Sequence, residues 1–116
     1  MSLCCDPLLD LLDPRLFKAL SDPNRITMFC QLADCCGGMT VSEMAERFPI
    51  DISVVSRHLA LLRDAGLLKS TRDGKQVRYW LMVSDVVDRL RKIADALETC
   101  CLAAKTSACS PLEERP

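Results

Sequence analysis

The chain has 116 residues, of which 49% are hydrophobic and four are glycine, and its formal net charge is −1. This length predicts one domain with a modest core, and the composition excludes a disordered chain. The near-neutral charge excludes a strongly basic, nonspecific nucleic-acid binder.

No apolar run reaches membrane-spanning length, and the first residues lack the basic start and apolar core of a signal peptide. We therefore expect a cytoplasmic protein with no membrane partner. In a reducing cytosol, the eight cysteines do not predict a disulfide framework. Their thiols are instead available for metals or redox chemistry.

The N-terminal half predicts a series of short helices. Asp6-Pro7 and Asp13-Pro14 are both typical helix starts, and apolar residues from Leu8 to Leu20 form a helical stripe. Pro23 to about Ala33 forms a second helix. We expect its apolar residues to be largely buried: Ile26, Met28, Phe29, Cys30 and Leu32.

A turn at 35–38 separates this helix from a shorter one. Thr40 and Glu43 have the spacing of a capping box, which opens a helix through Phe48. Residues 49–51 then form a tight turn into the next helix. The two helices together predict a helix-turn-helix.

The helix after Asp51 has two distinct faces. Three- and four-residue intervals place an apolar set on one side: Val54, Val55, His58, Leu59, Leu61 and Leu62. The opposite side carries Ser53, Ser56, Arg57, Ala60 and Arg63. Asp51 is a plausible N-cap, and Gly66 ends the helix. The hydroxyls and guanidinium groups suit phosphates and base edges in a major groove, so this is the predicted recognition helix.

The period then changes from helical to alternating on both sides of Asp73-Gly74, which is a strong hairpin signal. Arg72, Lys75 and Arg78 would carry positive charge on this hairpin, as a wing that touches DNA does. Residues 53–80 hold six basic and two acidic residues, a net +4, which leaves −5 for the rest. An ordinary solvated surface is the alternative for any single cation, but the ordered set favours DNA binding.

The last predicted helix is capped by Ser84. Its apolar face comprises Val86, Val87, Leu90, Ile93, Ala94, Leu97 and Cys101. A small domain cannot bury both this face and the first helix, so we expect a homodimer through the first and last helices. A twofold dimer would read a palindromic operator in double-stranded DNA. The expected organisation is a domain over 1–102 and a flexible tail over 103–116. The fold class is mostly α with a β-hairpin wing (α+β), a winged helix-turn-helix.

An enzyme is not indicated, because no nucleophile with a base, phosphate-binding glycine loop or carboxylate cluster is evident. The chain resembles the ArsR family of winged-helix repressors, which sense metals and metalloids. The resemblance covers about residues 14–101 and is carried by three phrases: FKALSDPNRI at 17–26, VSRHL at 55–59 with LRDAGL at 62–67, and RDGK at 72–75 with Tyr79.

The resemblance implies a dimer that represses by occupying its operator and leaves it when an inducer binds. Its DNA-facing positions correspond to Ser53, Ser56, Arg57 and His58 with the basic residues of the wing; Arg63 is added from the outer helix face. No cofactor is required for DNA binding. His58 can also be interpreted as a partly buried packing histidine on the DNA side, and we prefer this interpretation to any role as a metal ligand.

Two sensing sites of the family are missing here. The family's arsenic site requires Cys-Val-Cys where this chain has Thr40-Val41-Ser42, and its zinc site requires histidines in the last helix, whereas His58 is the only histidine. The remaining candidates are thiols, which suit As(III) and Sb(III). Cys100-Cys101 followed by Cys109 resembles the C-terminal thiol arrangement of atypical arsenite sensors. Cys4 and Cys5 could donate a third sulfur or form a second site across subunits.

Other uses of the cysteines remain open. The Cys35-Cys36 pair in its glycine-rich turn could be an independent site, although nothing nearby in the sequence completes it. Some family members respond to oxidants or reactive sulfur by linking a cysteine on the second helix to one on the last. Cys30 and Cys100 or Cys101 occupy about those positions, so a redox-sensing repressor is the alternative function.

Overall fold

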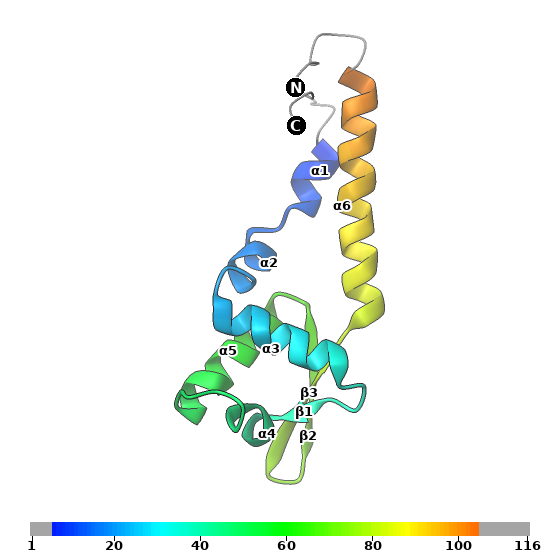
Figure 1. Ribbon diagram of the computed structural model, residues 1–116. Helices are drawn as coiled ribbons and strands as arrows, with labels where there is room; N and C mark the ends of the chain where they lie inside the picture. The colour runs from blue at the N-terminus through cyan, green and yellow to red at the C-terminus, as the bar shows by residue number, and fades with distance from the viewer. Residues whose placement is uncertain (1–5, 105–116) are drawn as a thin grey trace. The chain divides into compact units, whose positions relative to one another are not determined.

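The computed structural model describes the backbone of residues 6–104 and the side chains of residues 8–72 and 74–99 (Figure 1). The chain divides into two compact units. One is Pro14–Val86, and the other combines Met1–Asp13 with Val87–Pro116. The expected tail over 103–116 lies outside the described residues, apart from positions 103 and 104, which end the last helix.

The Pro14–Val86 unit contains the predicted helix-turn-helix and wing. Its elements are α2 (Pro14–Ala19), α3 (Pro23–Asp34), β1 (Met39–Thr40), α4 (Val41–Ala45), α5 (Ile52–Asp64), β2 (Leu68–Asp73) and β3 (Gln76–Leu81). The strands form an antiparallel sheet in the order β1-β3-β2. The predicted fold class, mostly α with a β-hairpin wing, is confirmed.

The strand β1 is an addition to the prediction. It pairs Met39 with Tyr79 and Thr40 with Arg78, so β3 lies in the middle of the sheet. A two-residue strand is too short to show an alternating pattern in the sequence. Its effect is to attach the turn after α3 directly to the wing.

Side-chain caps begin the helices where the sequence predicted. The carboxylate of Asp22 accepts a hydrogen bond from the backbone N–H of Asn24 at 2.8 Å and begins α3. Thr40 and Glu43 form the full capping box of α4, with bonds of 2.9 and 3.1 Å. Asp51 caps α5. These caps satisfy backbone donors that a helix leaves unpaired in its first turn.

The core of this unit is built from the inward faces of the helices and the base of the hairpin. Its largest fully buried side chains are Leu16, Met28, Val55, Met44, Leu59, Leu62 and Leu67. On α5 the predicted inward face is confirmed at Val55, Leu59 and Leu62, whereas Leu61 is exposed. It lies two positions beyond Leu59, which turns it about 200° around the helix axis.

The prediction that Cys30 is buried in α3 was wrong, and so was that for Ile26. Both side chains are exposed, while Arg25, Met28 and Leu32 form the buried face of this helix. The interval of three and four residues determines the buried side, and position 30 falls outside it. The buried face of α3 therefore includes an arginine, whereas the sequence predicted a face made of apolar residues alone.

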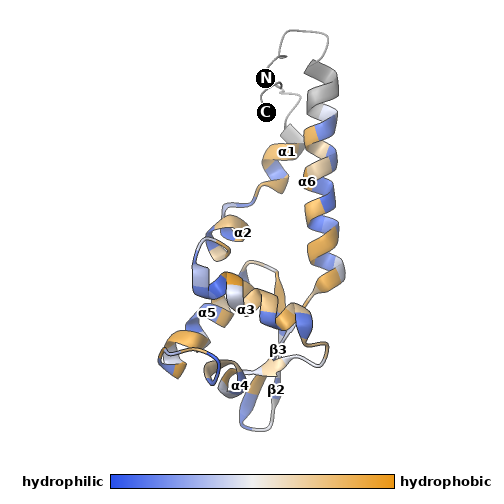
Figure 2. Cartoon of the chain, viewed as in Figure 1, coloured by the Kyte–Doolittle hydropathy of each residue, from blue (hydrophilic) through white to orange (hydrophobic). Residues whose placement is uncertain are grey.

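The second unit contains α1 (Asp6–Leu11) and all but the first residues of α6 (Val83–Ala104), which begins one residue before the predicted cap, Ser84. Within it, Arg89 Nη2 lies 3.9 Å from Asp13 Oδ2. Hydrophobic residues recur along α6 among hydrophilic ones (Figure 2). Several apolar side chains of this unit are exposed, including Leu90 and Leu97 at 52% each and Leu9 on α1 at 66%. No helix among the described residues is both long and apolar enough to cross a membrane.

Candidate nucleic-acid interface

The first turns of α5 present polar side chains to solvent. Ser53, Ser56 and Arg57 are all exposed, as predicted for the outer face of the recognition helix. Ser53 is not independent of the cap, because its hydroxyl and its backbone N–H both donate to Asp51 Oδ2, the latter at 3.0 Å. Its oxygen lone pairs remain available as acceptors.

The helix and the wing meet in one depression of about 290 Å³. Ser53 and Ser56 line it from α5, Lys75 lines it from the hairpin loop, and Ser42 contributes from α4. Its other lining residues are Val41, Ile52, Gln76 and Val77. Three of the predicted DNA contacts are therefore brought together, and hydroxyl groups beside an ammonium group are suited to phosphate oxygens.

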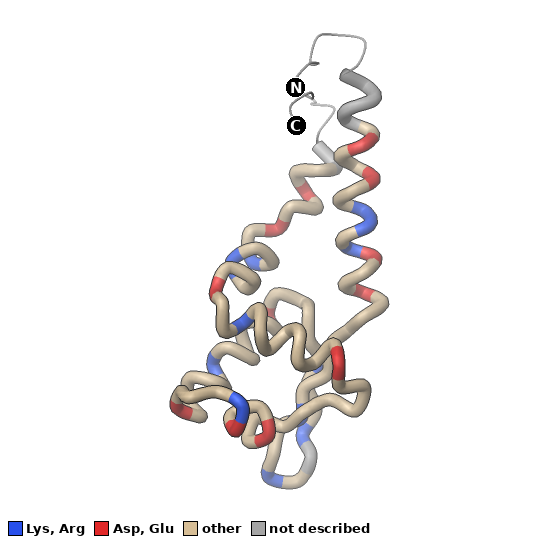
Figure 3. The backbone as a smooth tube through the Cα atoms, in the orientation of Figure 1, with Lys and Arg blue, Asp and Glu red and all other residues tan. Residues whose placement is uncertain are grey.

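The shape of the hairpin divides its cations between two faces. Cross-strand partners are Arg72 with Val77 and Thr71 with Arg78, and successive residues of a strand point to opposite faces. Arg72 therefore shares a face with Val77, which lines the depression, whereas Arg78 lies on the other face. Gly74 has φ +68° at the first loop position, and Lys75 follows it with a negative φ. This pattern fits a II′ turn. Positive charge gathers toward the tip of the hairpin (Figure 3).

Arg78 is engaged within the protein. Its Nη1 donates to the carbonyl oxygen of Gly38 at 3.4 Å and lies 3.8 Å from Glu43 Oε1. Because the same Glu43 oxygen accepts the backbone N–H of Thr40, the guanidinium connects the wing to the start of α4. Arg78 stays a predicted DNA contact, but these bonds already give it a structural role.

His58 is half-buried and faces inward from α5. Its Nδ1 lies 3.0 Å from Nη1 of Arg25. A guanidinium only donates hydrogen bonds, so Nδ1 must accept and the proton of the neutral ring belongs on Nε2. This agrees with the preferred reading of His58 as a packing residue on the DNA side.

Arg63 lies at the other end of the recognition helix. Its Nε and Nη2 atoms are 3.2 and 3.1 Å from Asp64 Oδ1. Both side chains are exposed, and a pair of this kind adds little stability. Arg63 stays a predicted contact, but the neighbouring carboxylate reduces the positive charge available there.

The pKa values of the two caps are both lowered. Side-chain and backbone donation from Ser53 lower the pKa of Asp51 below its ordinary value and outweigh its desolvation. For Asp22, desolvation by burial raises the pKa. Hydrogen bonds from the backbone N–H groups of Asn24 and Arg25, together with the charge of Arg25, outweigh this effect, so the pKa is lowered. Both caps are therefore ionised at neutral pH, and Asp51 places a negative charge beside the first turn of α5.

The predicted thiol ligands are mostly beyond what the structure describes. The backbone places Cys100 and Cys101 in α6, but their side chains, like Cys4, Cys5 and Cys109 as a whole, lie outside the described part. The described thiols are Cys30 and Cys36, which are exposed, and Cys35, which is half-buried; none is in a disulfide. Within the described part, no group of three or more His, Cys, Asp or Glu side chains could hold a metal ion.

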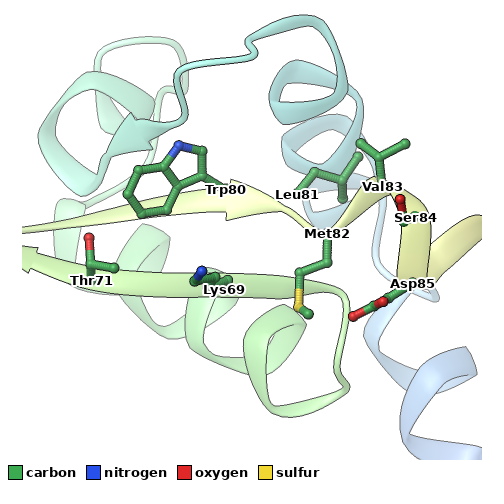
Figure 4. A pocket seen from close by; sticks show the side chains of 8 residues that line it. All are labelled: Lys69, Thr71, Trp80, Leu81, Met82, Val83, Ser84 and Asp85. Carbon is green, nitrogen blue, oxygen red and sulfur yellow. The ribbon is translucent and has the colours of Figure 1, made fainter.

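A second depression of about 440 Å³ lies at the base of the hairpin (Figure 4). Its lining residues are Lys69, Thr71, Trp80, Leu81, Met82, Val83, Ser84 and Asp85. None of the predicted DNA contacts with a described side chain lines it. The predicted contact that lines a depression of the hairpin, Lys75, lies at the other end.

Sequence reasoning missed two residues of the interface region. Ser42 in the 290 Å³ depression carries no signal beyond its place in the capping box. Arg25 could have been found, because it has core spacing with Met28 and Leu32 yet is charged. A charged residue at such a position predicts a buried network and not a surface contact.

Comparison with known proteins gives an independent indication. A helix-turn-helix domain model matches residues 20–71. The regulator YgaV of Escherichia coli K12 is 36% identical over 64 residues, which are 55% of this chain and 64% of YgaV. CmtR of Mycobacterium bovis is 35% identical over 83 residues, 72% of this chain and 69% of CmtR. The arsenical resistance operon repressor of E. coli K12 is 38% identical over 71 residues, 61% of this chain and 60% of the repressor. The chain thus spans about two thirds of the length of these relatives.

Solved structures agree on the fold. An ArsR family regulator, RHA00566, superposes with a TM-score of 0.63 at 21% identity, over 87% of this chain and 94% of that one. HlyU of Vibrio cholerae superposes with a TM-score of 0.56 at 27% identity, over 80% and 88% of the two chains. The winged helix-turn-helix, the exposed hydroxyl and guanidinium groups of α5 and these relatives lead to one conclusion: the chain belongs to the ArsR family of DNA-binding transcriptional regulators.

Proposed function

We propose that this chain is a transcriptional repressor that leaves its operator when a thiophilic inducer binds, with trivalent arsenic or antimony, inorganic or methylated, as the inducer. The observation that carries the DNA-binding half is the joining of Ser53, Ser56 and Lys75 in one depression. The proposed DNA contacts are made by Ser53, Ser56 and Arg57 on α5 and by Arg72 and Lys75 on the wing. His58, Arg63 and Arg78 contribute less to DNA binding.

DNA recognition then follows the usual division between the grooves and the backbone. Arg57 and Ser56 are exposed on α5 and would reach base edges in a major groove. Lys75 and Arg72 would contact phosphates, which fixes the position of the helix without reading sequence. The cap Asp51 repels phosphate and so disfavours docking by the N-terminal end of α5 alone.

The proposed working form is a homodimer. Exposed apolar side chains on α1 and α6, Leu9, Leu90 and Leu97 among them, support it because such residues in water are unfavourable. A second copy of the same faces would cover them through a twofold interface. Such a dimer would read a palindromic operator whose half-sites lie about 34–36 Å apart.

The proposed inducer site is formed by Cys100 and Cys101, with Cys109 or the Cys4-Cys5 pair as the source of further sulfur. Soft thiolates favour arsenic and antimony over hard cations. The likeness to an arsenical resistance operon repressor supports this class of inducer. Binding there would change how the dimer presents its two recognition helices, and a coupling of roughly 1–3 kcal/mol changes operator affinity about 5- to 150-fold.

The test is a titration of the reduced protein bound to a fluorescent operator fragment from its own upstream region. Arsenite, antimonite, methylarsonous acid, Zn(II) and Cd(II) are added separately, and anisotropy reports release. Release by near-stoichiometric arsenical or antimonite, lost in Cys100→Ser/Cys101→Ser, is the expected result.

The matched control is Cys30→Ser, which removes an exposed thiol of α3 and should leave this response intact. The Cys100→Ser/Cys101→Ser variant should bind the operator normally before inducer is added. A variant that loses operator affinity without inducer would show that these cysteines serve packing. Release of the wild-type protein only by Zn(II) or Cd(II) would reject the metalloid assignment.

A redox-sensing repressor is the second candidate, because Cys30 is exposed and not buried among apolar side chains. Peroxide would remove two electrons and two protons from Cys30 and a cysteine of α6 and leave a disulfide. Release by peroxide or persulfide but not by arsenicals, with the new linkage found by mass spectrometry, would select this function. Cys30→Ser would then abolish the response.

A further inference from the structure

The adjacent thiols Cys35 and Cys36 follow directly on the C-terminus of α3. Cys35 is the C-cap residue of that helix, and the backbone N–H of Gly38 donates to the Cys35 carbonyl at 3.0 Å, which closes a tight turn. Cys36 is exposed and Cys35 half-buried. A Cβ built on Gly37 would meet nothing within 4 Å, so the outer side of the turn has open space for an adduct.

The thiol of Cys35 shares its hydrogen-bond acceptor with the wing. Its Sγ donates to the carbonyl oxygen of Gly38 at 3.4 Å, and Arg78 Nη1 donates to the same oxygen at 3.4 Å. Arg78 also pairs with Glu43 of the capping box. A change at the Cys35 sulfur therefore acts on the group that fixes Arg78 of β3.

Gly38 itself is held tightly against the same strand. It has φ +77°, and a Cβ added there would lie 2.6 Å from the Tyr79 carbonyl oxygen and 2.9 Å from the Trp80 indole. Displacement of the turn must therefore displace β3 or the indole. The residue after Gly38 begins β1, which pairs with β3 as well.

From these contacts we propose that Cys35 and Cys36 form a second inducer site, which captures a monosubstituted trivalent arsenical and transmits its binding to the wing. Two thiols match the two exchangeable valences of such an arsenical, whereas arsenite requires three, and the described part offers no third sulfur in a metal-binding group. Cys100 and Cys101 take no part in this site, which does not depend on the function proposed for them.

The reaction with phenylarsine oxide is balanced without an oxidant. Both As–O bonding pairs are replaced by two As–S bonds, and the oxide oxygen leaves with the two thiol protons as one water molecule. Arsenic stays trivalent. The Cys35 proton that is donated to Gly38 is lost in this step, so the hydrogen bond to the carbonyl is broken and both sulfurs must turn toward one atom.

The test isolates the pair by replacing the other six cysteines with serine: Cys4, Cys5, Cys30, Cys100, Cys101 and Cys109. Trp80 is the single tryptophan of the chain, so all tryptophan emission comes from the indole that lies against Gly38 of this turn. Titration with phenylarsine oxide should give one adduct per chain by intact mass and a saturating change in emission that 2,3-dimercaptopropanol reverses. Operator affinity should fall at least about 5-fold.

The matched controls are the same six-serine protein with Cys35→Ser or Cys36→Ser added, neither of which should form the bridged adduct. If the six-serine protein does not fold, peptide mapping of the wild-type chain serves instead, with Cys35→Ser/Cys36→Ser as its control. Absence of a bridge between Cys35 and Cys36 would overturn the site. An adduct with unchanged Trp80 emission and operator affinity would overturn its coupling to the wing. Neither outcome bears on Cys100 and Cys101.

Discussion

Arg25 and His58 form a partly buried link between α3 and α5. The guanidinium Nη1 lies 3.0 Å from Nδ1 of the imidazole, while Nε and Nη2 donate to the carbonyls of Ala19 and Lys18 at 2.8 and 3.2 Å. Arg25 is only 9% exposed. One side chain therefore joins the end of α2, the first turn of α3 and the middle of α5, and it holds His58 inward, beside the exposed Arg57.

Substitution of Arg25 should lower the free energy of unfolding, because its hydrogen bonds lie within the protein. Arg25→Ala leaves two carbonyls and Nδ1 of His58 without their donor, so we expect the free energy of unfolding to fall by about 3 kcal/mol. Arg25→Lys should restore only part of it, because a single ammonium cannot reproduce the planar fork. Urea unfolding followed by circular dichroism measures both.

The matched control is Arg57→Ala, which removes a guanidinium one residue before His58 on the exposed side of α5. Its stability should stay within about 0.5 kcal/mol of wild type, while operator affinity falls. A double-mutant cycle of Arg25→Ala with His58→Ala should be non-additive by about 0.5–3 kcal/mol. Additive effects would show that the two side chains do not interact in solution.

The loss of stability in acid should come in part from Asp22, the N-cap of α3. The pKa of Asp22 is lowered in the folded state, so its contribution is complete above the unfolded value of about 3.9 and is lost as pH falls through the lower folded value. Asp22→Asn keeps a good N-cap but removes the charge. The difference in stability between wild type and this variant should be constant from about pH 5 to 7 and should disappear in stronger acid.

Thermal unfolding of both proteins, from neutral pH down into acid below the unfolded pKa of aspartate, provides the measurement. Asp22→Ala is the control for geometry, since it removes the acceptor at every pH and should remain less stable than Asp22→Asn. A difference between wild type and Asp22→Asn that grows as the solution is acidified would contradict the sign of the shift.

Substitution by alanine should destabilise the protein at only one of the two glycines in the turn after α3. Gly38→Ala places a Cβ 2.6 Å from the Tyr79 carbonyl at a positive φ, so we expect a loss of about 2 kcal/mol or more. Gly37→Ala meets nothing within 4 Å and should be close to neutral. Chemical denaturation compares them, and equal losses would mean that contact with β3 does not hold the turn.

Local signals predicted the elements of this fold well, because caps and turns depend on residues that are adjacent in sequence. Pro23, Thr40 and Asp51 located helix starts, and Asp73-Gly74 located the hairpin. Burial was less predictable. Apolar composition suggested that Cys30 lies inside, whereas the buried face of α3 includes Arg25. The charge of Arg25 could only be understood once the carbonyls of α2 and His58 of α5 were found beside it.

The same limit applies to the candidate interface. The sequence predicted a positive wing, but charge alone does not say which face a cation occupies. The pairing of Thr71 with Arg78 and of Arg72 with Val77 separates the two arginines. The strand β1, which had no detectable pattern, pairs Thr40 with Arg78, and the partners of the guanidinium, Gly38 and Glu43, lie on either side of this strand. Three-dimensional pairing therefore divides one predicted cluster into cations on the face of the depression and an arginine that is bonded within the protein.

This division can be tested by the salt dependence of operator binding. Lys75→Ala and Arg72→Ala should each weaken affinity and reduce the slope of log K against log salt by about 0.9, the value for one phosphate contact. Lys69→Ala is the matched control: it removes the same charge from the same hairpin, but Lys69 lines the depression at the other end, beside Trp80 and Asp85. Its slope should equal that of wild type, because screening by salt depends on contacts with phosphate and not on total charge. If Lys69→Ala and Lys75→Ala change the slope equally, the wing attracts DNA only through its overall charge, and the surface formed by Ser53, Ser56 and Lys75 is not the docking face.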